Sequence, residues 1–216
     1  MDVFTLGITG RVGRRAADGL RSRGDKVSGL VRRPRDAASL AADGFRVHVG
    51  DLGAMTADEL ASLVEGVDVI VYTAGSNGGD REVTDSIDRD GVAKAAEAAR
   101  LAGVRRFVLV SVFPEAWRER DLPDDEEYYF AAKKEAEVAL TRTDLDWLIL
   151  RPSLLTDGPA TGRIAIGPAE LHGQISTEDV AAVLTLILHE PSFSRQILEL
   201  NEGDDPVEAA ISRCVP

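Results

Sequence analysis

Apolar runs that suit buried strands alternate along the whole chain with segments that have helical spacing. The strand-like runs cover 3–8, 26–31, 45–49, 67–72, 106–112, 147–150 and 197–200, and the helical ones cover 12–22, 36–42, 56–64, 84–101, 127–141 and 176–189, with a terminal helix from Pro206. Near-continuous Val/Ile/Leu strands separated by helices are typical of a parallel sheet with helices on both faces. The pattern predicts an α/β, doubly wound parallel sheet with right-handed crossovers.

Composition limits the classes of protein that the chain can belong to. It has 216 residues, of which 44% are apolar, enough for the core of one domain spanning 1–216. A net charge of -12 argues against nucleic acid and anionic membrane as partners. The single cysteine, Cys214, cannot form an internal disulfide, the longest apolar run (180–188) is too short for a bilayer, and residues 1–2 lead directly into a strand without a signal pattern. We therefore expect a cytoplasmic protein.

A glycine-rich turn, Gly-Ile-Thr-Gly-Arg-Val-Gly at 7–13, joins the first strand to the first helix. A diphosphate needs backbone N–H donors within contact range, and a Cβ in the wrong place would hold it away. Gly7 permits the tight turn, Gly10 the close approach and Gly13 the packing of helix on strand. The helix that starts near Arg11 directs its positive end at the phosphates. An ordinary structural turn is the alternative, but the position between strand and helix favours a Rossmann-like dinucleotide site.

Three arginines at the end of the second strand indicate which dinucleotide binds. Sites for NAD typically have Asp or Glu there for the ribose 2′-hydroxyl, whereas sites for NADP have Arg for the 2′-phosphate. This chain has Arg32, Arg33 and Arg35, and no acid before Asp36. A planar guanidinium grips phosphate with two hydrogen bonds, and Arg11 could also approach it. A solvated basic turn is the alternative; we predict NADP(H) as the cofactor.

A tyrosine and a lysine are spaced one helical turn apart at Tyr129 and Lys133. On a helix, residues i and i+4 lie on one face. A nearby ammonium favours phenolate and lowers the pKa of a tyrosine, which makes it useful for proton transfer. Ser111 ends the fifth strand and precedes this helix. The alternative is an amphipathic helix in which the tyrosine packs and Lys133 pairs with Glu137.

Other chemistry-bearing residues give weaker signals. His48 lies on the polar face of a strand, His172 lies beside a glycine- and proline-rich segment, and His189 ends a helix whose dipole suits a cation. The spacing of His, Cys and carboxylate residues predicts no metal site. The acidic run 121–127 is interpreted as a solvated loop and helix start.

These motifs in this order resemble the short-chain dehydrogenase/reductase superfamily. The similarity is greatest to its atypical NAD(P)H-binding branch, which includes small bacterial epimerase/dehydratase-like proteins, NmrA-like proteins and biliverdin-IXβ/flavin reductases. It covers nearly the whole chain. The matching stretches are 7–13, 30–34, 49–52, 73–75, 87–91, 108–111, 129–133, 151–157 and 175–181.

The resemblance implies roles for individual residues. The cofactor-binding set that it implies, together with the arginines, is Gly7, Thr9, Gly10, Arg11, Val12, Gly13, Arg32, Arg33, Asp51, Leu52, Thr73, Ala74, Gly75, Lys133 and Pro152. Within it, the positions of Asp51 and Leu52 lie against adenine in that family, and those of 73–75 line the ribose and nicotinamide. Ser111, Tyr129 and Lys133 occupy the positions of the catalytic triad. Asp88 stands where the superfamily has an asparagine, and this departure puts the usual proton relay in question.

These resemblances imply an NADP(H)-dependent oxidoreductase that acts on a small carbonyl or conjugated acceptor. Two alternatives stay open: an NADP(H)-sensing regulatory protein without catalysis, and an NAD(P)-dependent epimerase or dehydratase. We expect residues 152–175 to form a substrate loop. The helices at 84–101 and 127–141 pair across a two-fold axis in a homodimer or simply cover the sheet.

Overall fold

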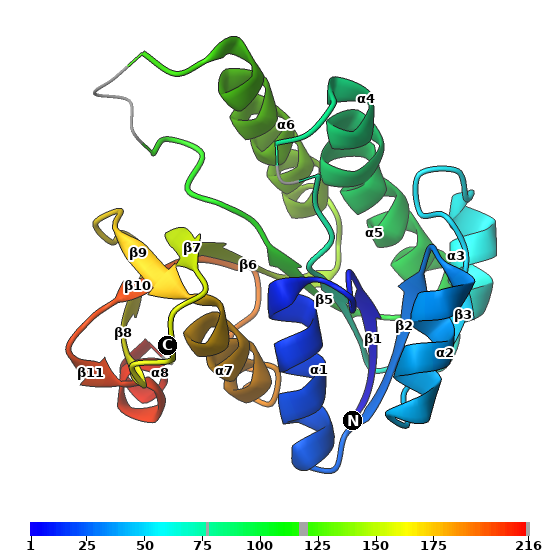
Figure 1. Cartoon of the computed structure of the whole chain (residues 1–216), viewed down its shortest axis with the longest axis horizontal. Coiled ribbons are helices and arrows are strands. Elements are labelled where there is room, and N and C mark those ends of the chain that lie inside the picture. The colour runs from blue at the N-terminus through cyan, green and yellow to red at the C-terminus, as the bar shows by residue number, and fades with distance from the viewer. Residues whose placement is uncertain (77, 117–120, 215–216) are drawn as a thin grey trace.

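A nine-stranded sheet with helices on both faces forms the centre of the molecule (Figure 1). The computed structural model describes residues 1–76, 78–116 and 121–214. The strands are β1 (Asp2–Leu6), β2 (Lys26–Val31), β3 (Arg46–Val49), β4 (Val69–Tyr72), β5 (Arg106–Val110), β6 (Asp146–Pro152), β7 (Leu154–Thr156), β8 (Arg163–Gly167), β9 (Gln174–Ser176), β10 (Gln196–Glu202) and β11 (Asp205–Pro206). The helices are α1 (Arg11–Ser22), α2 (Pro34–Ala42), α3 (Ala57–Leu63), α4 (Arg81–Val83), the π-helical η1 (Thr84–Arg89), α5 (Asp90–Ala102), α6 (Asp124–Thr141), α7 (Thr177–Ile187) and α8 (Val207–Cys214).

The strand order confirms the predicted doubly wound fold. It runs β11-β8-β10-β6-β5-β4-β1-β2-β3, and all neighbours from β10 to β3 are parallel. The order β3-β2-β1-β4-β5-β6 is that of the Rossmann fold, in which the direction of winding reverses between β1 and β4. Ligands of such sheets bind at the carboxyl ends of the strands at this reversal, which here places Gly7 and Thr73 side by side.

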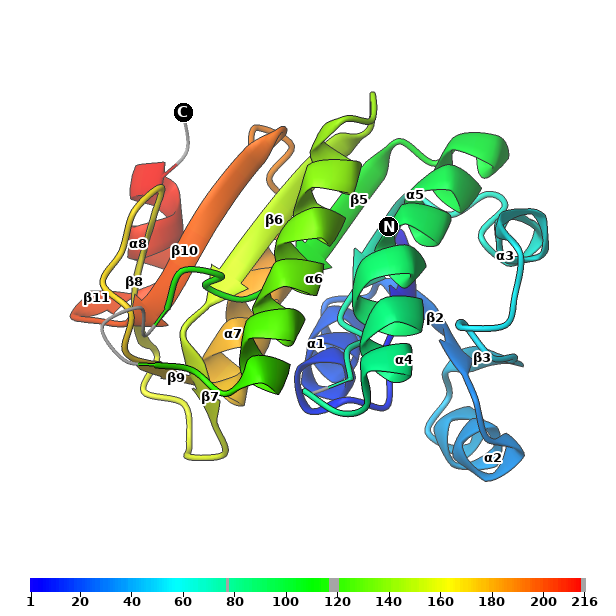
Figure 2. The same ribbon diagram turned by 90° about the horizontal axis from the view of Figure 1, so that it is seen from above.

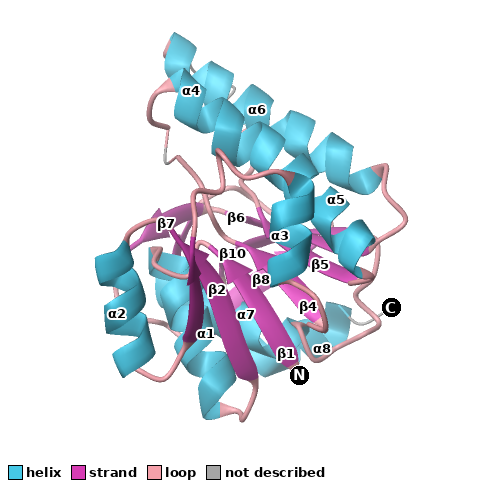
Figure 3. Ribbon diagram, turned by 90° about the vertical axis from the view of Figure 1, so that its right-hand side faces the viewer, coloured by secondary structure: helices cyan, strands magenta, loops and turns pink. Residues whose placement is uncertain are grey.

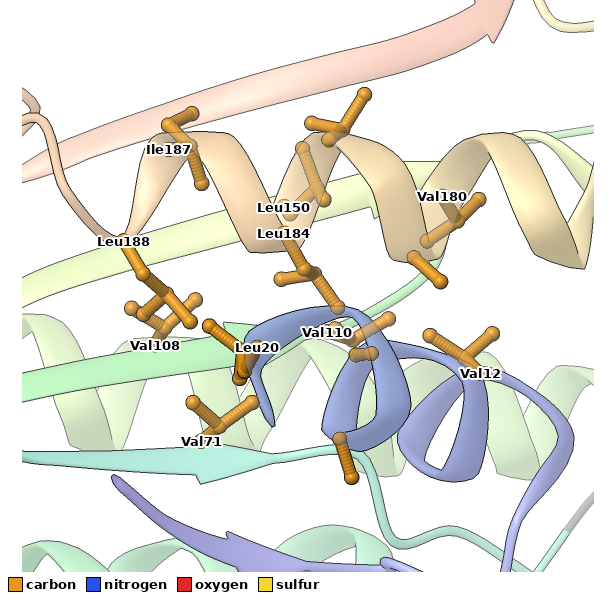
Figure 4. Close-up of a cluster of buried hydrophobic side chains, with 14 of the residues drawn as sticks. Val12, Leu20, Val71, Val108, Val110, Leu150, Val180, Leu184, Ile187 and Leu188 are labelled. Carbon is orange, nitrogen blue, oxygen red and sulfur yellow. The ribbon is translucent and has the colours of Figure 1, made fainter. Parts of the chain in front are cut away.

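Two hydrophobic clusters hold the layers together (Figures 2 and 3). On one face, α1, α2, α7 and α8 pack on the sheet; on the other, α3, α5 and α6 do so. Figure 4 shows Leu20 of α1, Leu184 of α7, and Val108 and Val110 of β5 within one of these clusters. These side chains are buried, so each contributes roughly 1.5–3 kcal/mol by leaving water. No helix in the part of the chain that the structure describes is long and apolar enough to cross a membrane.

The segment expected to be a substrate loop, 152–175, contains β7, β8 and most of β9, with irregular stretches between them. β8 joins the main sheet antiparallel to β10, and β7 pairs with β9 in a separate two-stranded sheet. The reason is the alternation at 163–167, where Ile164 and Ile166 are buried and the residues between them are not as deeply covered. The stretches at 157–162 and 168–173 keep the irregular character that the sequence suggested.

Two local predictions also need correction. The segment 84–101 is not one continuous α-helix, because Thr84–Arg89 is π-helical before α5 begins. π-Turns are frequent at functional sites. At the start of α7, the spacing of Ser176 and Asp179 predicts a capping box, and Ser176 does cap the helix by accepting from the N–H of Asp179. However, the Asp179 carboxylate does not complete a capping box: it accepts from the Ser176 hydroxyl and from the backbone of Thr161 and Gly162.

Candidate functional site: a glycine-lined crevice and its adjoining pocket

The glycine turn leaves bare backbone at the carboxyl edge between β1 and β4. Gly7 has a φ of +95°, and a Cβ there would lie 2.5 Å from the backbone nitrogen of Ala74. A Cβ on Gly13 would lie 2.3 Å from the Gly7 oxygen, so α1 can approach β1 only because that residue is glycine. Gly10 is the N-cap of α1 and no side chain caps this helix, whereas Thr56 caps α3. The N-terminal N–H groups of α1 therefore face an anion without competition from a capping side chain.

The three arginines at the end of β2 differ in their ion pairs. Arg33 donates to Asp36 at 2.7 Å, and Arg35 lies 3.8 Å from the same carboxylate. Arg32 directly follows β2, is exposed, and has no ion pair among the residues described here. Arg11, at the start of α1, donates to both carboxylate oxygens of Asp157 at 2.9 and 3.0 Å. Arg32 is thus the arginine at this edge whose guanidinium is not paired with a carboxylate of the described residues.

The residues that follow β3 and β4 complete the crevice. The Asp51 carboxylate accepts from the Gly53 N–H at 2.9 Å, which leaves its second oxygen for other partners. Leu52 is buried and supplies an apolar surface. Thr73 donates its hydroxyl to the Leu6 carbonyl at 3.0 Å and so joins the ends of β4 and β1. Ala74 and Gly75 continue along the same edge; Thr9 is exposed and Val12 is buried in the core.

A pocket of about 450 Å³ adjoins the crevice at the ends of β5 and β6. Ser111, Tyr129 and Pro152 line it together, although they come from different elements. The Ser111 hydroxyl is buried and has no hydrogen-bond partner in the described structure. A buried hydroxyl without a partner costs free energy, so it marks a position where a ligand oxygen would be stabilising.

A buried ion pair lies behind Tyr129. The Lys133 ammonium is 3.6 Å from the Asp88 carboxylate, with side-chain exposures of 3% and 0%. Lys133 also donates to the Val110 carbonyl at 3.5 Å, and the second Asp88 oxygen accepts from the Ser76 N–H at 2.8 Å. Burial lowers the pKa of Lys133, while the carboxylates of Asp88 and Glu137 oppose that shift. Lys133 therefore pairs with Asp88; the Glu137 carboxylate instead accepts from Arg151 at 2.5 and 3.1 Å.

The expected lowering of the Tyr129 pKa is not what the structure gives. Burial raises the pKa of this phenol well above its ordinary value of 10, and the nearby Asp88 carboxylate raises it further. The ammonium that was expected to favour phenolate is neutralised by Asp88. Tyr129 is consequently a neutral phenol at physiological pH.

Comparison with known proteins agrees with this geometry. The family model described as NAD(P)H-binding matches residues 7–191, from the first glycine of the turn to the end of α7 and beyond. The chain belongs to the NAD(P)H-binding family. This NAD(P)H-binding protein is 33% identical over 219 residues to the "uncharacterized sugar epimerase YhfK" of Bacillus subtilis, covering 99% of this chain and 100% of that one.

Two solved structures show the same architecture at full length. The oxidoreductase ylbE from Lactococcus lactis superposes with a TM-score of 0.86 and 26% identity, covering 99% of this chain and 96% of the other. ChuY, an anaerobillin reductase from Escherichia coli O157:H7, gives a TM-score of 0.79 and 27% identity over 95% and 98% of the two chains. The fold and the NAD(P)H-binding class are therefore those of the family.

The structure of this NAD(P)H-binding protein adds pocket residues that the sequence had not indicated. They are Gly78, Val112, Phe113, Glu126 and Phe130; the lining residues Ser153, Leu154, Leu155 and His172 lie within the segment 152–175 that was expected to contact the substrate. Phe113 and 153–155 lie just past the carboxyl ends of β5 and β6, so the rule that sites form at these ends could have found them. Glu126 was part of an acidic run interpreted as solvated. Among the described residues, no group of three or more His, Cys, Asp or Glu side chains is arranged to hold a metal ion.

Proposed function

We propose that the protein is an NADPH-dependent reductase of a small carbonyl or conjugated acceptor. The observation that carries the proposal is the pocket beside the glycine-lined crevice, which the buried, unpartnered Ser111 hydroxyl and Tyr129 line together. Two hydroxyl-bearing residues that line one pocket next to a nicotinamide site are suited to a substrate oxygen on which negative charge develops.

The crevice fits a reduced dinucleotide with an additional phosphate. The uncapped start of α1 and the turn at Gly7, Gly10 and Gly13 would hold the diphosphate, and Arg32 would hold the 2′-phosphate. Asp51 and Leu52 would contact the adenosine, and Thr73 and Pro152 would face the nicotinamide half. When bound, the reduced cofactor supplies a hydride.

Tyr129 acts as the proton donor in this proposal. Its phenol is in the protonated form because burial and Asp88 raise its pKa. Ser111 donates a hydrogen bond to the same substrate oxygen and holds it within reach. As charge moves onto the tyrosine oxygen, Lys133 provides the compensating cation from behind, one helical turn away. The Asp88–Lys133 pair keeps that cation in place when the site is at rest.

The same features favour reduction over the two alternatives. A sugar epimerase begins by removing a proton from a hydroxyl, whereas burial and Asp88 raise the pKa of the Tyr129 phenol, a direction that suits a proton donor better than a base. The segment after Pro152 supplies β8, β10 and α7 of the main fold instead of a separate sugar-binding domain. A sensor without catalysis has no use for a buried Lys133 beside a pocket tyrosine.

The test measures cofactor binding and turnover separately. NADPH and NADH affinities follow from quenching of protein fluorescence, and turnover from loss of NADPH absorbance with carbonyl, quinone and flavin acceptors. Tyr129→Phe should keep NADPH affinity and lose at least about 100-fold in kcat, the usual contribution of a positioned acid. The matched control is Tyr128→Phe, since this neighbour bonds to Asp85 outside the pocket. Unchanged turnover in Tyr129→Phe would remove the proposed donor, and absence of turnover with every acceptor would favour the sensor.

A further inference from the structure

The wall of the pocket that surrounds the two hydroxyls is mainly apolar. Phe113 and Phe130 are buried, and Leu154 and Leu155 extend the apolar surface towards the mouth. The ring of His172 meets the Phe113 ring edge-on, with centroids 5.2 Å apart. A surface of this kind stabilises a flat or branched apolar group and offers few hydrogen bonds to a polyhydroxylated one.

The volume of the pocket limits the size of the substrate. The whole space is about 450 Å³, at the lower end of the range of roughly 300–1,000 Å³ for ligand pockets. Because Ser111 and Pro152 line it, the same space must also admit the nicotinamide ring in the proposed function. What is left suits a compact body of about one aromatic ring.

The charges at the mouth disfavour an anion. Among the described lining residues, Arg11 is the sole Lys or Arg, and both oxygens of Asp157 already accept hydrogen bonds from it. Glu126, in the first turn of α6, places a carboxylate on the lining. A phosphorylated or carboxylated substrate would meet this charge without a free Lys or Arg beside it among the residues that the structure describes.

We propose that the substrate is an uncharged carbonyl compound with a compact apolar body, and that Glu126 is a specificity residue that disfavours anionic analogues. This inference rests on the proposed reductase function. Phe113 provides the contact surface, Ser111 and Tyr129 bind the carbonyl oxygen, and Glu126 acts at the mouth without taking part in proton transfer.

The experiment uses three aryl ketones that share one body and differ in charge: methyl 4-acetylbenzoate, 4-acetylbenzoate and (4-acetylphenyl)trimethylammonium. The ratio of kcat/KM for the neutral ester over the acid is measured in the wild type, Glu126→Gln and Asp124→Asn. The control, Asp124, is in the same first turn of α6 but does not line the pocket. We expect a ratio of at least about tenfold in the wild type, a roughly fivefold smaller ratio in Glu126→Gln, and a wild-type ratio in Asp124→Asn.

A second variant tests the apolar wall. Phe113→Ala should raise KM for the ester about tenfold with a smaller change in kcat, because it removes contact surface and not the proton donor. Equal kcat/KM for ester and acid, a preference for either charged ketone, or use of a nucleotide-sugar in place of the ketones would overturn the inference.

Binding measurements keep this result separate from the proposed function. Ligand-observed NMR on the protein saturated with NADP⁺ reports the affinity order of the three ketones whether or not they are reduced. If the ester binds best and Glu126→Gln reduces the difference in affinity between the ester and the acid, the inference stands even where the chemistry differs from reduction. If NADP⁺ binds but no ketone does, the substrate class is wrong while the cofactor assignment survives. Failure to bind either NADP⁺ or NADPH would refute the proposed function first.

Discussion

Replacing Asp88 by asparagine tests the charge state of the buried pair with one isosteric change. The Lys133 ammonium is 3.6 Å from the carboxylate, and neither side chain is exposed by more than 3%. At an effective dielectric constant of about 20, two unit charges at this separation attract by ~4.6 kcal/mol. Part of this is offset because the carboxylate no longer has to be desolvated, and the amide oxygen of the new side chain would still accept from the Ser76 N–H. We therefore expect Asp88→Asn to lower the free energy of unfolding by about 2–3 kcal/mol near pH 6.

The sign of the pH dependence follows from the lysine. Burial lowers the pKa of Lys133, and Asp88 opposes this, so the pKa falls further in the variant. Between that lowered pKa and the ordinary value of 10.5, the unfolded chain binds more protons than the folded one, and stability rises with pH. The loss of unfolding free energy that Asp88→Asn causes should thus become smaller between about pH 6 and pH 9.

Urea unfolding followed by circular dichroism at the two pH values provides the measurement. Asp90→Asn is the matched control, because Asp90 is an exposed partner of Arg89 in the next turn and should change stability by less than about 0.5 kcal/mol. If Asp88→Asn lowers the free energy of unfolding as little as Asp90→Asn does, or by an amount that does not change with pH, the Asp88–Lys133 pair is not ionised. The reasoning about the Tyr129 phenol would then fail with it.

Three further predictions concern the cofactor, the glycine turn and the opposite end of the sheet. In fluorescence titrations, Arg32→Ala should weaken NADPH binding at least about tenfold and leave NADH binding unchanged. Arg35→Ala should change the affinity for neither nucleotide. Equal losses of affinity for both nucleotides in Arg32→Ala would contradict the role of Arg32. Gly13→Ala puts a Cβ 2.3 Å from the Gly7 oxygen, so urea unfolding should show a loss of about 1–3 kcal/mol, and an unchanged midpoint would mean that α1 moves freely. Burial raises the pKa of Asp25, but hydrogen bonds from the N-terminal ammonium and His189 outweigh it and hold that pKa below 3.8. The stabilisation from Asp25 is present above this pH and lost below it. Asp25→Asn should therefore lower the free energy of unfolding by about 1–2 kcal/mol near pH 6, and by less as the pH falls through 3.8. Thermal unfolding measured over a series of pH values would show or refute this trend.

Features that depend on local patterns could be predicted from the sequence. The parallel strands follow from continuous Val/Ile/Leu runs, the end of α5 from Gly103 in its left-handed conformation, and the start of α3 from Thr56. The glycine turn could be placed because it needs only a strand before it and a helix after it. The family comparison supports the NAD(P)H-binding class that this turn indicated.

Features that depend on distant contacts could not be predicted. The spacing of Tyr129 and Lys133 predicts one helix face, but it carries no information on the carboxylate that η1 brings from Asp88. Burial raises the pKa of the Tyr129 phenol and the Asp88 carboxylate raises it further, which is opposite to the expected direction. In the same way, β8 gains its place by pairing with β10 and β11, and Glu126 lines the pocket because α6 starts beside it.

The loop at 168–173 has a consequence for how such a protein can acquire new substrates. β8 holds it at one end within the main sheet, β9 holds it at the other, and the Glu170 N–H donates to the Glu199 carboxylate midway at 2.8 Å. His172 of this loop reaches the pocket while the cofactor crevice lies on other elements. Evolution, or a randomised library confined to these positions, can therefore vary the recognition surface without altering the buried core or the glycine-lined crevice.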